Sequence, residues 1–181
     1  MRAVIVYESM YGNTRRIAES IAAGLGATMN VSVIGVSEAS PATLADADLV
    51  VVGGPTHMHG MSRTNTRKWA VEAAKSPAHV LDVEPDALGA GLRDWFESLG
   101  DYSVKAAAFD TRLDGPAALT GRASKGVAHH LRAHGFDLIA EPASFLVTKQ
   151  DVLEPDEQAR ARDWGATLAA RVPAATPSEG A

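Results

Sequence analysis

Hydrophobic residues are concentrated in five short runs along the chain, over residues 2–7, 31–36, 48–54, 104–110 and 138–147. The first, third and fourth runs are almost continuous and do not alternate with polar residues. Continuous runs of this length are typical of strands that are buried on both faces of a sheet. We therefore predict a β-strand at each of the five runs.

Amphipathic segments lie between and after these runs, and they predict helices over residues 14–26, 87–99, 121–134 and 155–171. In the first segment, Ile17, Ile21 and Leu25 recur every four residues, which places them on one face of a helix. Residues 61–86 interrupt the alternation of strands and helices, with a further short helix expected over 65–75. Because so long a connection inside a compact domain is more often functional than not, this segment is a candidate part of a site.

Strands that alternate with helices predict an α/β fold, in which helices cover both faces of a parallel sheet. Five strands in this rhythm fit the doubly wound order 2-1-3-4-5, whose ligands bind at the carboxyl ends of the strands. We predict a single domain over residues 1–172. The remaining residues, 173–181, are expected to form a disordered tail.

The composition of the 181-residue chain restricts its chemistry. The absence of cysteine excludes disulfides, thiolate metal sites, iron–sulfur clusters and cysteine nucleophiles. The formal net charge of −5 argues against nucleic-acid binding, which needs a basic surface. The apolar run at residues 2–7 is too short to span a membrane, and no signal-peptide cleavage site follows it. We therefore expect a cytoplasmic protein without a membrane partner.

The hexapeptide Ser-Met-Tyr-Gly-Asn-Thr at residues 9–14 follows the first strand and opens the first helix. Backbone amides and the helix dipole are available to an anion at such a position, and the side chains of Ser9, Asn13 and Thr14 add donors. A phosphate monoester is the natural ligand. Nucleoside triphosphates and dinucleotides fit poorly, because the chain has neither a Walker A lysine here nor a GxGxxG motif. The alternative is a turn in which these side chains only cap the helix.

This hexapeptide resembles the phosphate loop of the flavodoxin family, which reads roughly S/T-x-T-G-x-T after the first strand. Ser9, Gly12, Asn13 and Thr14 match that pattern, whereas Tyr11 stands where the family often has Thr. The resemblance covers nearly the whole chain and implies a flavodoxin-like doubly wound sandwich that binds FMN non-covalently. It also implies that the FMN phosphate is held by Ser9, Tyr11, Gly12, Asn13 and Thr14, with a backbone amide from Met10.

A second family signature, a strand that ends in Gly-Gly-Pro-Thr, lies within residues 51–63. By resemblance, the residues that flank the flavin ring are Pro55, Thr56, His57, Met58, His59 and Gly60. Family members often place Trp here, whereas this chain offers imidazole and thioether groups, which can also pack on a ring. A metal site at the two histidines is an alternative that lacks a third ligand, and a plain surface turn is another.

The third loop begins within residues 106–116, where the family brings Phe-Gly to the pyrimidine edge of the flavin. Phe109 matches this pattern, but Asp110 replaces the usual Gly. By position, Asp110, Thr111 and Arg112 are candidate ring contacts. The alternative is that Phe109 belongs to the core and that Asp110 caps a turn.

Four basic residues, Arg63, Arg67, Lys68 and Arg112, lie on the loops expected at the rim of the flavin site. Cations near the flavin favour its reduced, anionic form, whereas the carboxylates around a typical carrier flavodoxin disfavour it. The sequence therefore predicts a less negative reduction potential than that of a low-potential carrier. The alternative is that these side chains are solvated and contribute little.

The resemblance implies an FMN-binding electron-transfer protein, rather than a self-sufficient oxidoreductase, whose partners are redox proteins or a small organic electron acceptor. Two alternatives remain open: a small FMN-dependent NAD(P)H:quinone-type reductase, and a binding or regulatory module that has lost FMN because the ring-flanking aromatics are missing. Three tryptophans, Trp69, Trp95 and Trp164, fall within helical patterns and are expected to pack in the core.

Overall fold

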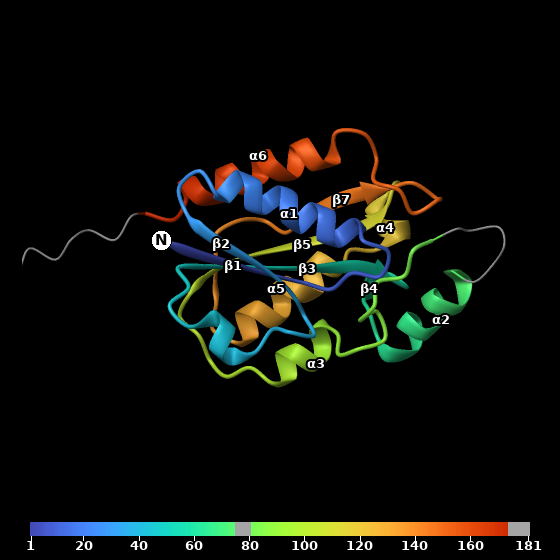
Figure 1. Ribbon diagram of the computed structural model, residues 1–181, viewed down its shortest axis with the longest axis horizontal. Coiled ribbons are helices and arrows are strands. Elements are labelled where there is room, and N and C mark those ends of the chain that lie inside the picture. The colour runs from blue at the N-terminus through green and yellow to red at the C-terminus, as the bar shows by residue number, and fades with distance from the viewer. Residues whose placement is uncertain (75–80, 174–181) are drawn as a thin grey trace, which may run out of the picture.

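The computed structural model describes residues 1–74 and 81–173, and its centre is a twisted parallel sheet (Figure 1). The strand order is β2-β1-β3-β5-β6, and β7 pairs in parallel with β5 beyond the end of β6. Two-residue strand β4 pairs antiparallel with the end of β3. The strand bounds are β1 Arg2–Tyr7, β2 Asn30–Gly35, β3 Leu49–His57, β4 Gly60–Met61, β5 Lys105–Leu113, β6 Asp137–Leu138 and β7 Ala143–Val147.

The predicted fold class and strand order are confirmed, with the fifth strand divided in two. Ala106 of β5 pairs with Leu138 of β6, and Phe109 of β5 pairs with Ala143 of β7. Between these two pairs, the segment that joins β6 to β7 therefore contains two more residues than β5 does. Pro142 lies in this interruption and has no amide hydrogen to donate to the sheet. Apart from Pro173, the predicted tail lies outside the described residues.

The helices lie in a layer on each side of the sheet (Figure 1). One layer holds α1 and α6, the other holds α3 and α5, and α2 lies beside the carboxyl ends of the central strands. The helix bounds are α1 Asn13–Leu25, α2 Thr64–Ala74, α3 Leu92–Glu97, α4 Ala117–Thr120, α5 Ala123–Ala133 and α6 Glu157–Ala170, with a 3₁₀ helix at Pro41–Leu44. The helix predicted over 87–99 is limited to α3, because Gly91 is extended and Asp94 accepts a hydrogen bond from its amide at 2.8 Å.

Neighbouring residues of the central strands are buried in different cores. In β1, Val4 and Val6 belong to the core beneath α3 and α5, whereas Ala3 and Ile5 belong to the core beneath α1 and α6. Strands that are buried on both faces therefore account for the continuous hydrophobic runs in the sequence.

The register of the strands brings three loops to one edge of the sheet. Tyr7 of β1 pairs with Gly53 of β3, and Gly53 pairs with Phe109 of β5. Pairing continues as far as Pro55 and Thr111, so the loops that follow the three strands leave the sheet side by side. A ligand at this edge can therefore contact all three loops.

Candidate functional site

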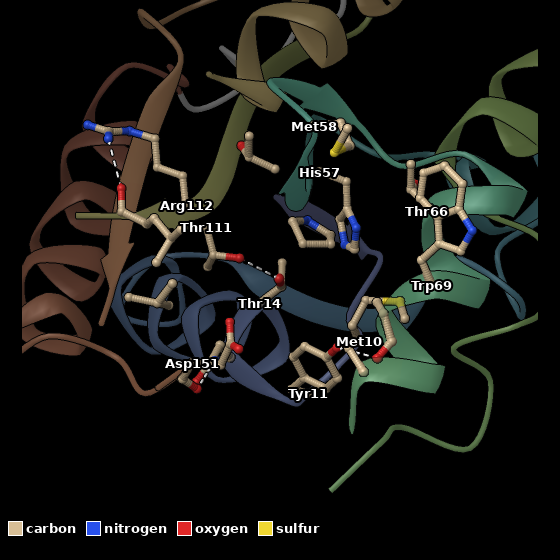
Figure 2. Close-up of a pocket in the computed structure, with 17 residues that line it drawn as sticks. Met10, Tyr11, Thr14, His57, Met58, Thr66, Trp69, Thr111, Arg112 and Asp151 are labelled. Carbon is tan, nitrogen blue, oxygen red and sulfur yellow. Dashed lines mark hydrogen bonds between the residues drawn. The ribbon is translucent and has the colours of Figure 1, made fainter. Parts of the chain in front are cut away.

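A cavity of about 380 Å³ opens at the carboxyl edge of the sheet, where β1, β3 and β5 end (Figure 2). Its volume lies in the range of small-molecule sites. Helix α2 forms one wall, and Val147 at the end of β7 and Asp151 before α6 also line the cavity. The residues predicted from the sequence that line it are Met10, Tyr11, Asn13, Thr14, Pro55, Thr56, His57, Met58, Thr111 and Arg112.

The loop 9–14 turns sharply from β1 into α1. Gly12 has a φ of 82°, in the left-handed region that favours glycine, and α1 begins at Asn13. The Gly12 amide donates to the Ser9 hydroxyl at 3.1 Å, and the Asn13 side chain donates to the Asp151 carbonyl at 2.6 Å. The first turn of α1 contains no acidic residue, and its amides have no acceptor within the helix. The positive end of the helix dipole therefore lies at the cavity without a counter-charge in that turn.

Two buried threonine hydroxyls meet at the same end of the cavity. Thr14 Oγ1 and Thr111 Oγ1 lie 2.8 Å apart, so β5 contributes directly to the neighbourhood of the loop (Figure 2). Only one hydroxyl hydrogen can lie between the two oxygens, which leaves the other available to a further acceptor. Helix amides, hydroxyls and the Asn13 side chain form a donor set that fits a phosphate group.

The end of β3 turns into β4 through a tight hairpin at residues 57–60. Its two central residues, Met58 and His59, have φ values of 46° and 75°. Such turns favour Gly, Asn and Asp, so each residue here adopts a strained conformation that costs about 1 kcal/mol. Gly121 packs against the turn, since a Cβ at Gly121 would lie 2.1 Å from the Cα of His59. The hairpin places the exposed Met58 side chain at the mouth of the cavity.

Helix α2 supplies a tryptophan at the cavity, whereas the loops that follow β3 and β5 contain no Tyr or Trp. Trp69 lines the cavity and is 63% exposed, so the prediction that it packs in the core is wrong. Tyr11 reaches α2 from the loop 9–14, and its hydroxyl donates a hydrogen bond to the Ala70 carbonyl at 2.7 Å. Burial raises the pKa of Tyr11, which keeps this donor protonated. Trp95, by contrast, is buried in the core as predicted.

The sequence does contain a signal for the position of Trp69. In the helix TNTRKWAVEAA, the residues three or four positions from Trp69 are Asn65, Thr66, Glu72 and Ala73, so no large apolar side chain shares its face. A tryptophan on a helix without an apolar face is more typical of a binding surface than of a core.

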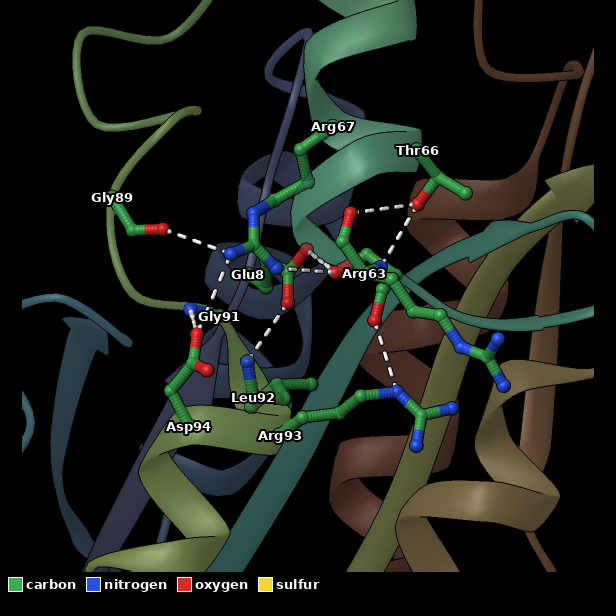
Figure 3. Close-up of polar contacts among 10 residues, drawn as sticks. Glu8, Arg63, Thr66, Arg67, Gly89, Gly91, Leu92, Arg93 and Asp94 are labelled. Atoms are coloured by element: carbon green, nitrogen blue, oxygen red, sulfur yellow. Dashed lines mark hydrogen bonds and ion pairs between the residues drawn. The ribbon is translucent and has the colours of Figure 1, made fainter.

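Arg67 attaches α2 to the rest of the protein (Figure 3). Its guanidinium is 4% exposed and donates to the Ser62 hydroxyl at 3.2 Å and to the Gly89 carbonyl at 3.1 Å. It also forms an ion pair with Asp94 at 3.4 Å. Arg67 therefore holds α2 against the segment that leads into α3.

Glu8, buried at the end of β1, extends this network to the sheet (Figure 3). Its carboxylate accepts hydrogen bonds from the Ser62 hydroxyl and, at 2.9 Å, from the Leu92 amide. Glu8 directly precedes the loop 9–14. The network consequently links that loop to α2 and α3.

Phe109 and Asp110 do not line the cavity. Phe109 is fully buried in the core beneath α1 and α6, and its ring fills the space where a Cβ of Gly53 would lie, at 2.3 Å. Asp110 is fully buried and accepts a hydrogen bond from the Ser124 amide at 2.7 Å, so it caps α5. Phe109 is therefore a core residue, as the alternative states, whereas Asp110 caps a helix and not a turn.

The four basic residues expected at the rim occupy different environments. Arg67 is buried in the polar network, and Lys68 is exposed and lines neither of the two cavities near α2. Arg63 lines the second of these cavities. Arg112 alone of the four lines the cavity at the carboxyl edge, where its Nε is buried without a hydrogen-bond partner in the described residues.

The flavodoxin family model matches residues 5–109, which is more than half of the chain. The chain belongs to the flavodoxin family. As a member of this family it is an FMN-binding protein of electron transfer, and the assignment favours neither the reductase nor the FMN-free regulatory module. The matched stretch includes the loop 9–14 and the hairpin 57–60, and it ends before Thr111 and Arg112.

Solved flavodoxin structures resemble this flavodoxin over almost its full length. A flavodoxin from the domain Archaea is 20% identical, with 95% of this chain and 99% of that chain covered and a TM-score of 0.64. Oxidised flavodoxin 1 from Bacillus cereus is 20% identical, with 92% and 95% covered and a TM-score of 0.62. The flavodiiron protein from Giardia intestinalis is 17% identical, with 94% of this chain but 36% of that chain covered and a TM-score of 0.60. A search of curated protein sequences gave no match.

The described residues were also searched for metal-ion sites and for helices that could span a membrane. Residues 1–74 and 81–173 contain no group of three or more His, Asp or Glu side chains placed to hold a metal ion. In the same part of the chain, no helix has both the length and the apolar character that crossing a bilayer requires.

Proposed function

We propose that this flavodoxin holds FMN in the cavity at the carboxyl edge, with the phosphate at the loop 9–14, and passes electrons to redox partner proteins. The observation that carries this proposal is the set of donors at the start of α1, where a left-handed glycine and buried Ser, Asn and Thr side chains meet a helix N-terminus whose first turn contains no acidic residue. The residues assigned to the phosphate are Ser9, Met10, Tyr11, Gly12, Asn13 and Thr14.

Thr111 belongs with the phosphate end of the site. By position Thr111 is a candidate ring contact, but its hydroxyl lies 2.8 Å from that of Thr14. One of these two hydroxyls donates to the other, and the remaining hydrogen is directed to an acceptor of the ligand. This arrangement gives β5 a part in phosphate binding.

The ring end of the site is assigned to Pro55, Thr56, His57 and Met58, together with Trp69. Met58 and Trp69 line the mouth of the cavity from the hairpin and from α2, and both are largely exposed. Arg112 lies at the β5 side. The side chains of Phe109 and Asp110 take no part, and His59 and Gly60 contribute as backbone of the hairpin.

When bound, FMN supplies the redox chemistry, because it takes up and releases electrons. The protein orients the cofactor and sets its surroundings. The thioether and indole at the mouth exclude water from one side of the cavity while leaving an edge accessible. An accessible edge suits transfer to a partner protein, since electrons then need not cross the core.

Purified protein tests this proposal through its bound flavin and its electron donors. We expect a yellow protein whose extracted flavin has the mass of FMN, at one per chain, and whose reduction by NADPH depends on a separate reductase. A colourless protein that fails to bind added FMN would contradict the cofactor assignment. Steady NAD(P)H:quinone turnover by the protein alone would contradict the carrier role.

A further inference from the structure

A second cavity, of about 510 Å³, lies beside the proposed FMN site. Four side chains line both cavities and form the wall between them: His57, Met58, Thr66 and Trp69. The rest of the second cavity comes from the β4 region, the start of α2 and one residue of α3: Gly60, Met61, Arg63, Thr64, Asn65 and Arg93. The phosphate loop contributes nothing to it, so the second cavity differs from the first in composition.

The charged groups of the second cavity are two guanidiniums. Arg93 donates from Nε to the Ser62 carbonyl at 3.1 Å, which fixes its side chain, and its terminal nitrogens form no hydrogen bond within the described part of the chain. Figure 3 shows Arg63 and Arg93 extending to the same side, away from Glu8 and Asp94. No acidic residue lines the cavity, and among the described residues neither guanidinium forms an ion pair. In a protein of net charge −5, this is a local concentration of positive charge without a counter-ion among residues 1–74 and 81–173.

The part of the second cavity away from the two arginines is suited to a planar apolar ring. The indole of Trp69 and the thioethers of Met58 and Met61 line it, and aromatic and thioether groups both pack well on planar rings. Thr64 and Asn65 add hydrogen-bonding groups at the start of α2. Guanidinium groups bind carboxylates in a planar, bidentate manner.

We propose that the second cavity binds a small planar organic anion of the aromatic carboxylate class, with its charge on Arg63 and Arg93 and its ring against Trp69. This site goes beyond the FMN function and does not depend on it. Because four side chains are shared, occupation of one cavity affects the other, and thermodynamic linkage makes the effect reciprocal. The anion would then lie next to the mouth through which electrons leave.

Calorimetric titration with 2-naphthoate tests the site in both the FMN-free and the FMN-saturated protein. We expect one naphthoate per chain in both forms, and no saturable binding of the uncharged analogue 2-naphthamide. In the double variant Arg63→Gln/Arg93→Gln, naphthoate affinity should fall at least about tenfold, while FMN affinity changes less than about twofold. Lys68→Gln is the matched control, because this exposed cation on α2 lines neither cavity and should leave naphthoate affinity unchanged.

Four results would overturn the proposal: no saturable naphthoate binding, equal binding of the amide, displacement of naphthoate by FMN, or an equal loss of FMN affinity in the double variant. The last two would make the arginines part of the flavin site. If the double variant does not fold, Arg63→Gln alone decides, since the described residues show no hydrogen bond from its guanidinium. Because the FMN-free protein is titrated separately, failure of FMN binding and failure of the anion site give different results.

Discussion

The side chains at the cavity differ in how many of their hydrogen-bond donors already have an acceptor within the protein. Asn13 and Tyr11 each donate to a backbone carbonyl, which fixes the loop 9–14 to the segment before α6 and to α2. Arg112 Nη1 donates to the Leu113 and Gly115 carbonyls, whereas its Nε has no partner in the described residues. The side chain of Arg112 therefore lines the cavity, while its guanidinium is held at the rim by the segment that follows β5.

Arg112 should make the potential of bound FMN less negative, because a cation favours the reduced, anionic flavin. In Arg112→Gln we expect the potential to become more negative by on the order of 30 mV, which corresponds to a Coulomb energy of about 0.7 kcal/mol across a partly solvated gap. Redox titration of the FMN-loaded proteins measures this change. Lys68→Gln is the control, and an equal shift in that variant, or a shift to less negative values in Arg112→Gln, would contradict the role of Arg112.

The pKa of His57 should make the FMN-free protein less stable in acid. Burial, and then the positive charge of Arg67, lower the pKa of His57 from its ordinary value of 6.5. The unfolded chain therefore binds more protons below that value, so stability present above pH 6.5 is lost as the pH falls through the lowered pKa. We expect the denaturant midpoint to fall between about pH 7.5 and about pH 5.5.

Variants separate the contribution of His57 from those of other groups. His57→Gln should remove part of the pH dependence, whereas His129→Gln, on the exposed side of α5, should retain it. Burial also lowers the pKa of His130, so a residual dependence is expected in His57→Gln. A pH dependence in His57→Gln equal to that of the unaltered protein would contradict this account.

The sequence predicted the turn at the loop 9–14 better than the surroundings of Trp69 and Phe109. Loop 9–14 combines a motif with its position between strand and helix, and both are readable in one short segment. Helical spacing alone wrongly predicts that Trp69 packs in the core, because no large apolar residue lies three or four positions from it. Phe109 was ambiguous because only the three-dimensional structure shows that its ring fills the space above Gly53.

At the scale of secondary-structure elements, α2 is unusual because a polar network attaches it to the protein. Arg67 is its only buried residue, and the Tyr11 hydroxyl adds one hydrogen bond. The helix also carries Trp69, which lines both cavities. The position of the Trp69 indole therefore depends on the hydrogen bonds that Arg67 donates, since these hold α2 in place.

Arg67→Met should destabilise the protein by about 2 kcal/mol, because the buried Ser62 and Glu8 groups lose a charged neighbour in their network. It should also shift the fluorescence emission of Trp69 as α2 loosens. Lys68→Met, the exposed neighbour, serves as the control and should change neither quantity. Retention of full stability and of the emission maximum in Arg67→Met would show that α2 is held by other contacts.

The packing of α1 on α6 depends on two glycines that allow close contact between the helix backbones. A Cβ at Gly165 would lie 2.3 Å from the Ile21 carbonyl, and one at Gly24 would lie 2.0 Å from the Arg162 carbonyl. Gly165→Ala should therefore cost about 1–3 kcal/mol in denaturant unfolding. In the control Gly126→Ala on α5, the new methyl would meet only the flexible Met61 thioether at 3.0 Å, so a smaller loss is expected. Equal losses would contradict the argument.

The sequence predicted the central strands well and the irregular segments poorly. Continuous apolar runs in β1, β3 and β5 reflect burial on both faces, which is a property of the strand itself. The interruption before β7 and the shortening of the helix 87–99 to α3 depend on single residues, Pro142 and Gly91, whose effects are local. The hairpin at 57–60 was not predicted, because Met58 and His59 are unfavourable at positive φ.

At the scale of the whole molecule, the doubly wound topology explains why the site lies where it does. Strands β1, β3 and β5 end at one edge, so loops that are more than forty residues apart in sequence line one cavity. The family assignment gives FMN as the cofactor, and the geometry places helix amides and hydroxyl groups at one end of that cavity and Met58 with Trp69 at its mouth. The central claim is that the loop 9–14 binds the FMN phosphate.

Comparison of FMN with riboflavin, which lacks the phosphate, tests this claim. Flavin-free protein should bind FMN at least about 100-fold more tightly than riboflavin, because charge-assisted hydrogen bonds to the phosphate are lost with riboflavin. In Thr14→Val this ratio should fall about tenfold, with riboflavin affinity unchanged. Equal affinity for the two flavins, or an equal loss of both in Thr14→Val, would contradict the placement of the phosphate at the loop 9–14.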